Sequence, residues 1–286
     1  MGELIPFDAR DGQIWMNGEL VPWKDARLHV LSHGLHYASC VFEGERAYAG
    51  KVFKLEEHSQ RLIDSARLLG FEIPYTREEL DRATMETITA NGLSDCYVRP
   101  VAWRGSEQMG VSAQNTTIHV AIAVWEWGAY YPDLTLTHAI FRRPSPETAP
   151  VHSKAAGLYM ICTLSKHAAE AKGFADALML DYRGYVAETT GANIFLVMNG
   201  SLHTPIADCF LNGITRRTVI ELAERRGIPV IERHILPEEL DHAQEIFVTG
   251  TAAEITPVRA IEDRRYQLGP VTRDLMDDFA ALTRAG

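Results

Sequence analysis

Two asparagine-glycine pairs and one arginine-glycine pair interrupt short runs of apolar residues that have the length of strands. Asn17-Gly18 lies within IWMNGELVPW, Arg183-Gly184 within DALMLDYRGYVAE and Asn199-Gly200 within ANIFLVMNGSLHTP. Pairs of this kind are typical of tight hairpin turns, so each predicts two adjacent antiparallel strands. Hairpin-rich sheets are unlike the regular alternation of strand and helix in a doubly wound fold. We therefore expect a mixed α+β fold, with hairpin-rich sheets flanked by helices.

Helices are expected beside these strands. Residues 54–70 carry apolar side chains at helical spacing, and residues 76–92 repeat the pattern. Thr76 and Glu79 fit a capping box at the start of the second segment. Residues 211–227 predict another helix.

The composition changes in the middle of the chain. Residues 131–150 hold four prolines around one short strand-like run, without a helical period. We therefore expect a smaller N-terminal α/β domain over residues 1–130, an interdomain linker over 131–150 and a larger C-terminal domain over 151–286.

The charge balance limits the possible partners. The 286 residues include 28 Lys and Arg against 38 Asp and Glu, which gives a formal net charge of −10. Such a surface repels phosphate backbones and anionic headgroups, so neither nucleic acid nor membrane is expected as a partner. Arginines do concentrate locally in RPVAWR, FRRP and TRR. A small anionic metabolite is therefore the expected ligand.

The cysteines favour a reducing compartment. Cys40, Cys96, Cys162 and Cys209 form no C-x-x-C pair, so neither a zinc site nor a disulfide scaffold is indicated. The N-terminus carries no apolar stretch of signal-peptide length, and runs such as VAIAVW are too short to span a bilayer. We expect a cytoplasmic protein with reduced thiols.

Three features could bind an anion. Gly213-Ile214-Thr215 opens a predicted helix, Gly250-Thr251-Ala252 follows a strand, and Arg61 lies within HSQRLIDSA. Free amides at a helix start and a guanidinium both bind phosphate or carboxylate. Each feature has a plainer alternative, either an ordinary helix cap or a solvated arginine.

Lys154 stands at the entry of a helical segment and is followed by the small residues Ala155, Ala156 and Gly157. A solvent-exposed lysine is the plain interpretation. The alternative is that the small residues leave space for a flat ligand to which Lys154 is covalently attached. The sequence lacks H-E-x-x-H, G-x-S-x-G and G-x-G-x-x-G, so we expect no metal, no serine hydrolase elbow and no dinucleotide fingerprint.

The order of motifs along the chain resembles the fold type IV pyridoxal-phosphate enzymes, and specifically the branched-chain amino acid aminotransferases. The motifs that carry the resemblance are LHYASCVFEGERAY (35–48), HSQRLIDSA (58–66), YVRP (97–100), MGV (109–111), WGAY (127–130), SKAAGLY (153–159), AETTGANIF (187–195), LNGITRR (211–217) and TGTAAEITPV (249–258). Single motifs have a high risk of chance matches, but their agreement in order over nearly the whole chain favours a common family.

The resemblance implies pyridoxal 5'-phosphate as cofactor, bound mainly by the C-terminal domain. Lys154 would attach to it and move a proton during catalysis. Glu188 would hold the proton of the pyridine nitrogen, and Tyr159 would hydrogen-bond the phenolic oxygen of the ring. The phosphate would be bound by Arg61 and by residues at the two glycine-containing turns, namely Leu211, Gly213, Ile214, Thr215, Gly250 and Thr251.

The resemblance also implies a substrate site for branched-chain L-amino acids and 2-oxo acids. Tyr97 and the amides of Thr251 and Ala252 would bind the α-carboxylate, and Arg99 the distal carboxylate of glutamate. Phe42, Tyr130 and Tyr159 would line an apolar pocket. Tyr37 and Val111 would reach in from the second subunit of a homodimer or higher homo-oligomer.

Other activities of the same fold remain as alternatives, namely a D-amino acid or (R)-amine transaminase or an aminodeoxychorismate lyase. A non-catalytic binding protein is the alternative from another class, but the sequence retains both Lys154 and Glu188. Two positions depart from the family pattern. Glu45 stands in FEGERAY, where it could pair with Arg46 or Arg99, and Asn212 is a good helix cap.

Overall fold

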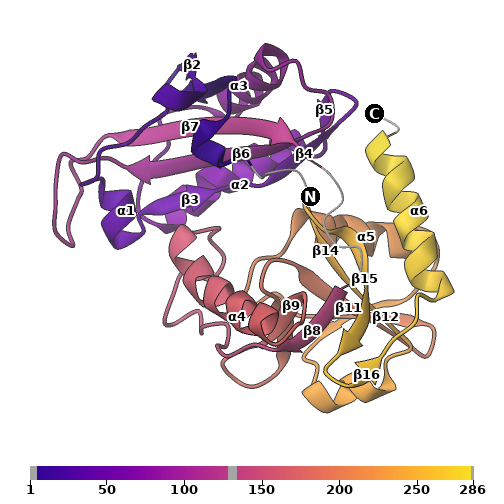
Figure 1. Cartoon of the computed structure of the whole chain (residues 1–286). Helices are drawn as coiled ribbons and strands as arrows, with labels where there is room; N and C mark the ends of the chain where they lie inside the picture. Colours follow the sequence, from indigo (N-terminus) through magenta and orange to yellow (C-terminus); the bar gives the residue numbers. More distant parts are fainter. Residues whose placement is uncertain (1–4, 128–133, 285–286) are drawn as a thin grey trace. The chain divides into compact units, whose positions relative to one another are not determined.

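The computed structural model describes residues 5–127 and 134–284. The chain divides into two compact units, Met1–Gly128 with Ser153–Gly157 and Ala129–His152 with Leu158–Gly286. Each unit has its own sheet and its own hydrophobic core (Figure 1). This combination of sheets and helices confirms the predicted α+β class.

The first unit contains a seven-stranded sheet in the order β2-β1-β7-β6-β4-β5, with β3 also paired to β6. Its strands are β1 (Gln13–Met16), β2 (Glu19–Pro22), β3 (Cys40–Phe42), β4 (Glu45–Tyr48), β5 (Lys51–Val52), β6 (Cys96–Arg104) and β7 (Ile118–Glu126). The β1–β2 connection turns at Asn17 and Gly18, whose φ angles are 54° and 105°. A two-residue hairpin turn requires such positive angles, and the predicted hairpin is confirmed.

Helices α2 (Leu55–Leu68) and α3 (Arg77–Ala90) pack on this sheet. The capping box predicted for α3 is present, because the Glu79 N–H donates to Thr76 Oγ1 and the Thr76 N–H donates to Glu79 Oε2. Apolar side chains of both helices are buried against the strands and form one core, which includes Leu62, Leu80, Val98 and Ile122. The shorter helical segments of the unit are η1 (Phe7–Ala9), η2 (Trp23–Asp25) and α1 (His33–Tyr37).

The second unit contains a nine-stranded sheet in the order β10-β9-β8-β15-β14-β11-β12-β13, with β16 paired to β15. Its strands are β8 (Leu134–His138), β9 (Asp176–Leu180), β10 (Val186–Thr189), β11 (Asn193–Met198), β12 (Ser201–Pro205), β13 (Val230–Arg233), β14 (Glu245–Gly250), β15 (Glu254–Ile261) and β16 (Arg264–Arg265). Because β10 also pairs with β11, the strands β10, β9, β8, β15, β14 and β11 close into a ring. Closure leaves none of these strands with an unpaired edge.

The helices of the second unit are α4 (Met160–Ala171), α5 (Ile214–Arg225), η4 (Pro237–His242) and α6 (Pro270–Arg284), and η3 (Ala156–Tyr159) joins the two units along the chain. The expectation that Asn212 caps α5 is wrong, since Gly213 is the N-cap. Asn212 Oδ1 instead accepts a hydrogen bond from Arg216 (2.9 Å).

Residues 131–150, the predicted linker, include β8, which pairs in parallel with both β9 and β15. Residues 153–157, including Lys154, belong to the first unit by their contacts. The functional division into domains at 131–150 stays a prediction. Among residues 5–127 and 134–284, no helix combines the length and apolar character needed to cross a membrane.

Candidate active site

Lys154 lies in a segment whose backbone is held on two sides within the first unit. The Lys154 N–H donates to Ser65 Oγ in α2 (3.0 Å), and the Phe42 N–H donates to the Lys154 carbonyl (3.2 Å). Ser153 is buried, and its hydroxyl donates to the Ser65 carbonyl (3.0 Å). The Lys154 ammonium lies 5.1 Å from the centre of the Phe42 ring. These contacts fix the lysine against α2 and β3.

Arg61 is oriented by a buried carboxylate. Glu43 is fully buried and accepts two hydrogen bonds from Arg61, at 2.6 Å from Nε and 2.8 Å from NH2. His58 Nδ1 lies 2.7 Å from the second carboxylate oxygen. Burial alone would raise the pKa of Glu43, but the charge and hydrogen bonds of Arg61, with His58, hold it well below its ordinary value. Burial lowers the pKa of His58. The guanidinium of Arg61 is therefore held by a rigid bidentate partner.

Phe42, Tyr97 and Arg99 form one cluster with Lys154. The Arg99 guanidinium lies 4.8 Å from the centre of the Phe42 ring and donates to the Tyr97 hydroxyl (3.1 Å). Arg99 Nε is buried without a hydrogen-bond partner among the described residues. Gly44 leaves room for Tyr97, because a Cβ at Gly44 would lie 2.1 Å from the tyrosine oxygen. The cluster thus combines an apolar ring surface with a cation that retains hydrogen-bonding capacity.

Glu188 is held by two partners in the second unit. Arg143 Nε lies 3.3 Å from Glu188 Oε1, and Asn193 Nδ2 donates to Glu188 Oε2 (3.1 Å). Arg143 is buried, and although burial opposes its charge, Glu188 keeps the pKa of Arg143 raised. Arg143 NH1 also donates to the carbonyl of Leu158 (3.5 Å), the residue that precedes Tyr159. Arg143 therefore connects Glu188 to the segment that carries Tyr159, and the roles of Glu188 and Tyr159 stay predictions.

The start of α5 presents backbone amides, as expected for an anion site. Gly213 caps the helix, and its carbonyl accepts the first helical hydrogen bond, from the Arg217 N–H (3.0 Å). The amides of Ile214 and Thr215 lie in the first turn, where a helix offers no acceptor. The Leu211 carbonyl precedes this turn and accepts from Asn193.

Gly250 ends β14, and Thr251, Ala252 and Ala253 connect it to β15. Gly250 pairs with Glu254 across this tight turn, and the φ of Glu254 is 51°. The preceding strand residue, Thr249, pairs with Asn193 at the start of β11. The turn is therefore attached to the strand that also contacts Glu188.

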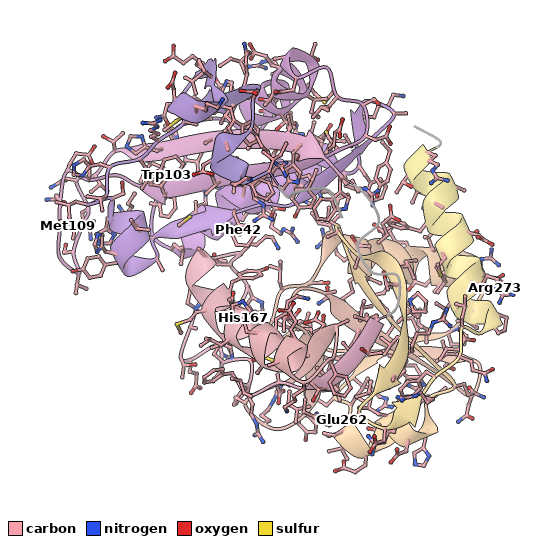
Figure 2. The ribbon with its side chains drawn as sticks, in the orientation of Figure 1. Phe42, Trp103, Met109, His167, Glu262 and Arg273 are labelled. Carbon is pink, nitrogen blue, oxygen red and sulfur yellow. The ribbon has the colours of Figure 1, made fainter. Side chains whose placement is uncertain are left out.

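Two residues predicted to act across a subunit interface, Tyr37 and Val111, are exposed. Tyr37 in α1 is 44% exposed, and Val111 in the β6–β7 loop is 89% exposed. His33 joins them, because its ring stacks on Tyr37 at 4.6 Å and its Nε2 lies 2.8 Å from the Gly110 carbonyl. Figure 2 shows Met109 in the same loop. Tyr130, predicted for the apolar pocket, lies outside the described residues.

The sequence left open whether Glu45 pairs with Arg46 or Arg99, and in the structure it pairs with neither. Its side chain is fully buried on β4, and neither carboxylate oxygen has a hydrogen-bond partner among the described residues. Burial, followed by the charges of Glu43 and Asp81, raises the pKa of Glu45 well above its ordinary value. Arg61 opposes the shift but does not cancel it. The raised pKa favours the uncharged form of this carboxyl group, and Glu45 makes no hydrogen bond to Arg99.

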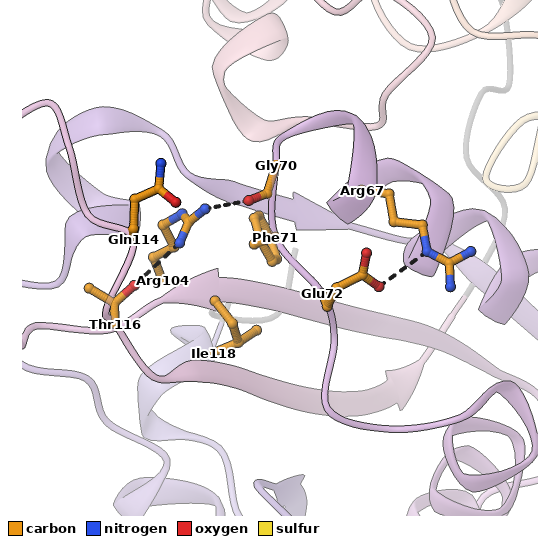
Figure 3. Close-up of a pocket in the computed structure, with 8 residues that line it drawn as sticks. All are labelled: Arg67, Gly70, Phe71, Glu72, Arg104, Gln114, Thr116 and Ile118. Atoms are coloured by element: carbon orange, nitrogen blue, oxygen red, sulfur yellow. Dashed lines mark hydrogen bonds and ion pairs between the residues drawn. The ribbon is translucent and has the colours of Figure 1, made fainter.

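In two other parts of the structure, the charged side chains that could bind a ligand already contact protein groups. A cavity of about 440 Å³ in the first unit has Arg67 and Arg104 in its wall, but Arg67 pairs with Glu72, and Arg104 donates to the Gly70 carbonyl and to Thr116 (Figure 3). Asp181, Asp208 and Cys209 could together ligate a metal ion. The Arg183 guanidinium already contacts both carboxylates, at 2.7 and 2.8 Å. The absence of a metal stays a prediction.

Three supporting residues were missed by sequence reasoning, namely Glu43, Arg143 and Asn193. Arg143 lies in FRRP, where the concentration of arginine was noted without a partner. Glu43 and Asn193 lie inside the motifs FEGERAY and AETTGANIF. A search for polar residues inside those motifs would have found both.

The family described as Amino-transferase class IV matches residues 40–261, and the chain belongs to it. The family predicted from the order of motifs is confirmed.

Similar proteins carry the name of one aminotransferase. The chain is 42% identical to the branched-chain-amino-acid aminotransferase of Pseudomonas aeruginosa, over 94% of this chain and 92% of that protein. It resembles the branched-chain aminotransferase of Thermoproteus uzoniensis solved with norvaline, at 40% identity and a TM-score of 0.93, over 96% of this chain and 95% of that one. The branched-chain amino acid aminotransferase of Thermobaculum terrenum, solved in its PLP-bound holo-form, gives 31% identity and a TM-score of 0.89 over 96% of this chain and 94% of that one.

Proposed function

We propose that this chain is a pyridoxal-phosphate-dependent aminotransferase that exchanges the amino group of leucine, isoleucine or valine with 2-oxoglutarate. The products are branched-chain 2-oxo acids and L-glutamate. The observation that carries the substrate assignment is the contact of Arg99 with Phe42 and Tyr97, because it joins a cation to an apolar surface. One pocket of this composition suits both an aliphatic side chain and a carboxylate.

The described residues offer the groups that this cofactor requires: an amine, an anion for the ring nitrogen, and donors for a phosphate. When bound, the cofactor supplies an aldehyde that takes up the amino group and a ring that draws electrons from the substrate. Lys154 would hold the cofactor through its amine and would move a proton at the substrate α-carbon. Glu188, held by Arg143 and Asn193, keeps the ring nitrogen protonated. Tyr159 would donate to the phenolic oxygen of the ring.

The phosphate is assigned to the three anion-binding features that the sequence indicated. Arg61 supplies a guanidinium that Glu43 orients, and Ile214 and Thr215 supply amides at the start of α5. Thr251 adds a hydroxyl from the β14–β15 turn. Leu211, Gly213 and Gly250 contribute backbone to the same two turns.

Different hydrogen-bond donors are assigned to the two carboxylates that a substrate can carry. Tyr97 and the amides of Thr251 and Ala252 bind the α-carboxylate that every substrate carries. Arg99 binds the distal carboxylate of glutamate only. Phe42, Tyr130 and Tyr159 form the apolar wall.

The absorbance spectrum of the purified holoenzyme tests this function. L-leucine should convert the lysine-bound form of the cofactor to pyridoxamine phosphate, and D-alanine should not. Conversion by D-alanine alone would favour a D-amino acid transaminase, and a protein without cofactor absorbance would favour a binding protein.

We also propose that the chain works as a homodimer or higher homo-oligomer in the cytoplasm. Exposed apolar residues gather on α1 and the β6–β7 loop, including Leu35, Tyr37, Met109 and Val111. A second copy would cover them and receive Tyr37 and Val111 at its own site. All four cysteines are free thiols, which fits a reducing compartment. Light scattering of the purified protein tests the assembly: a monomer that remains fully active would contradict it.

A further inference from the structure

We propose that Asn193 is a positioning residue that holds the two ends of the cofactor site in register. Its amide contacts the carboxylate assigned to the ring nitrogen and the turn assigned to the phosphate. This inference rests on the proposed function. It assigns Asn193 a role in cofactor binding through Glu188 and α5, without direct contact to the cofactor.

The side chain of Asn193 is buried and makes three hydrogen bonds. Asn193 Nδ2 donates to Glu188 Oε2 and to the Leu211 carbonyl, both at 3.1 Å. Asn193 Oδ1 accepts from the Gly213 N–H at 3.2 Å. Both protons of the amide are therefore used, one toward each end of the site.

The chemistry of the three partners decides the orientation of this amide. A carboxylate and a carbonyl can only accept hydrogen bonds, whereas the Gly213 N–H can only donate. The opposite orientation would place Oδ1 against two acceptors and leave the Gly213 N–H facing a donor. Asparagine therefore satisfies all three partners in one orientation.

The backbone of Asn193 adds a second connection. On one side Asn193 pairs with Glu188 of β10, and on the other with Thr249 of β14. Thr249 leads directly into Gly250 and Thr251. One residue thus lies between the strand of Glu188 and the strand that ends at the second phosphate turn.

Gly213 shows how close the contact with α5 is. A Cβ at this position would lie 2.3 Å from Asn193 Oδ1, far inside van der Waals contact. The glycine lets the N-cap approach the asparagine, and the amides of Ile214 and Thr215 follow directly. A displacement of Asn193 must therefore move the first turn of α5.

The test measures the two ends separately with the apo form of the full chain. Inorganic phosphate probes the phosphate turns, and pyridoxal, which lacks a phosphate, probes the ring end. We expect Asn193→Ala to raise the dissociation constants of both phosphate and pyridoxal by about tenfold, since each end loses a buried hydrogen bond. Glu188→Gln should weaken the binding of pyridoxal and leave the binding of phosphate unchanged. In the double variant, pyridoxal should bind as it does to Glu188→Gln alone, because Asn193 acts through Glu188.

Thr204→Val is the matched control for lost stability. Thr204 is buried in the same sheet and its hydroxyl donates to the Ile194 carbonyl (2.9 Å). This variant should lower the unfolding temperature without changing either affinity. The inference would be overturned if Asn193→Ala also lowered the unfolding temperature without changing either affinity. It would be overturned as well if Asn193→Ala weakened the binding of only one of the two ligands.

A second variant guards against loss of folding. Gly213→Ala pushes a methyl group against Asn193 Oδ1, and we expect the same paired loss of phosphate and pyridoxal binding. Unchanged affinities in a folded Gly213→Ala variant would equally overturn the inference. Failure of the wild-type chain to bind pyridoxal phosphate would instead refute the proposed function, so the two failures can be told apart.

Discussion

Replacement of Arg99 by leucine should separate the two substrates of the proposed reaction. The Arg99 guanidinium donates to the Tyr97 hydroxyl and lies over the Phe42 ring, and its Nε is buried without a hydrogen-bond partner among the described residues. A distal carboxylate bound here gains a cation that leucine does not use. The variant should therefore impair glutamate and spare leucine.

The expected size follows from the loss of a buried partner. Stripping a desolvated carboxylate of its cation costs about 2 to 5 kcal/mol, which is roughly 30-fold to several thousand-fold in rate. Stopped-flow absorbance measures the half-reactions with L-glutamate and L-leucine separately. We expect a loss in this range for glutamate and at most a few-fold change for leucine.

Arg104→Leu is the matched control, because Arg104 lies on the same strand, β6, and its replacement removes the same charge. Its guanidinium donates to the carbonyls of Gly70 and Ala113, and Figure 3 shows the contact with Gly70. Both half-reactions should persist in this variant. Equal losses for both substrates in Arg99→Leu would refute the reasoning, since Arg99 would then bind the α-carboxylate that they share.

The remaining predictions concern the lysine and two carboxylates. Lys154→Ala should fold and retain the cofactor only through noncovalent contacts, so the absorbance of the lysine-bound form and turnover should both be lost; wild-type absorbance in this variant would refute the assignment. Glu188→Gln should lower kcat by several orders of magnitude, because a neutral partner no longer holds the pyridinium proton, whereas near-normal rates would assign that role elsewhere. Glu45→Gln should remove a pH dependence of stability. Because the folded-state pKa of Glu45 is raised, its protonated carboxyl group adds to the free energy of unfolding below about pH 4.5. This contribution is lost, at up to about 1.4 kcal/mol per pH unit, as the pH rises through the folded-state pKa. The urea unfolding midpoints of the wild-type chain and of Glu45→Gln, measured from about pH 4.5 upward, would test this prediction. The same pH dependence of the midpoint in both proteins would contradict it.

Local signals in the sequence predicted the elements that depend on a few adjacent residues. The turns at Asn17-Gly18 and Asn199-Gly200 have the positive φ angles that the pairs implied. The capping box of α3 likewise needs only Thr76 and Glu79. Such features arise from the geometry of three or four residues, so a sequence can show them directly.

The closed ring of strands could not be predicted in this way. It depends on the pairing of β8 with β15, whose residues Leu134 and Val258 are far apart in the sequence. The same holds for the support of the candidate site. Arg143 and Glu188 meet through the fold, and no periodicity or spacing connects them. Asn212 shows the opposite error, because a residue of good capping type instead accepts a hydrogen bond from Arg216.

Two charged residues proposed to bind the cofactor, Arg61 and Glu188, are each held by a buried residue of opposite charge. In the first unit a buried carboxylate, Glu43, holds a cation, Arg61. In the second unit a buried cation, Arg143, holds a carboxylate, Glu188. A buried charge without a partner is costly, so each pair makes it possible to place a charged group inside the protein before any ligand arrives. Arg61 is then already partly neutralised by Glu43, and a phosphate with up to two negative charges needs further donors. The amides proposed for this role at the start of α5 would supply such donors without adding another buried cation.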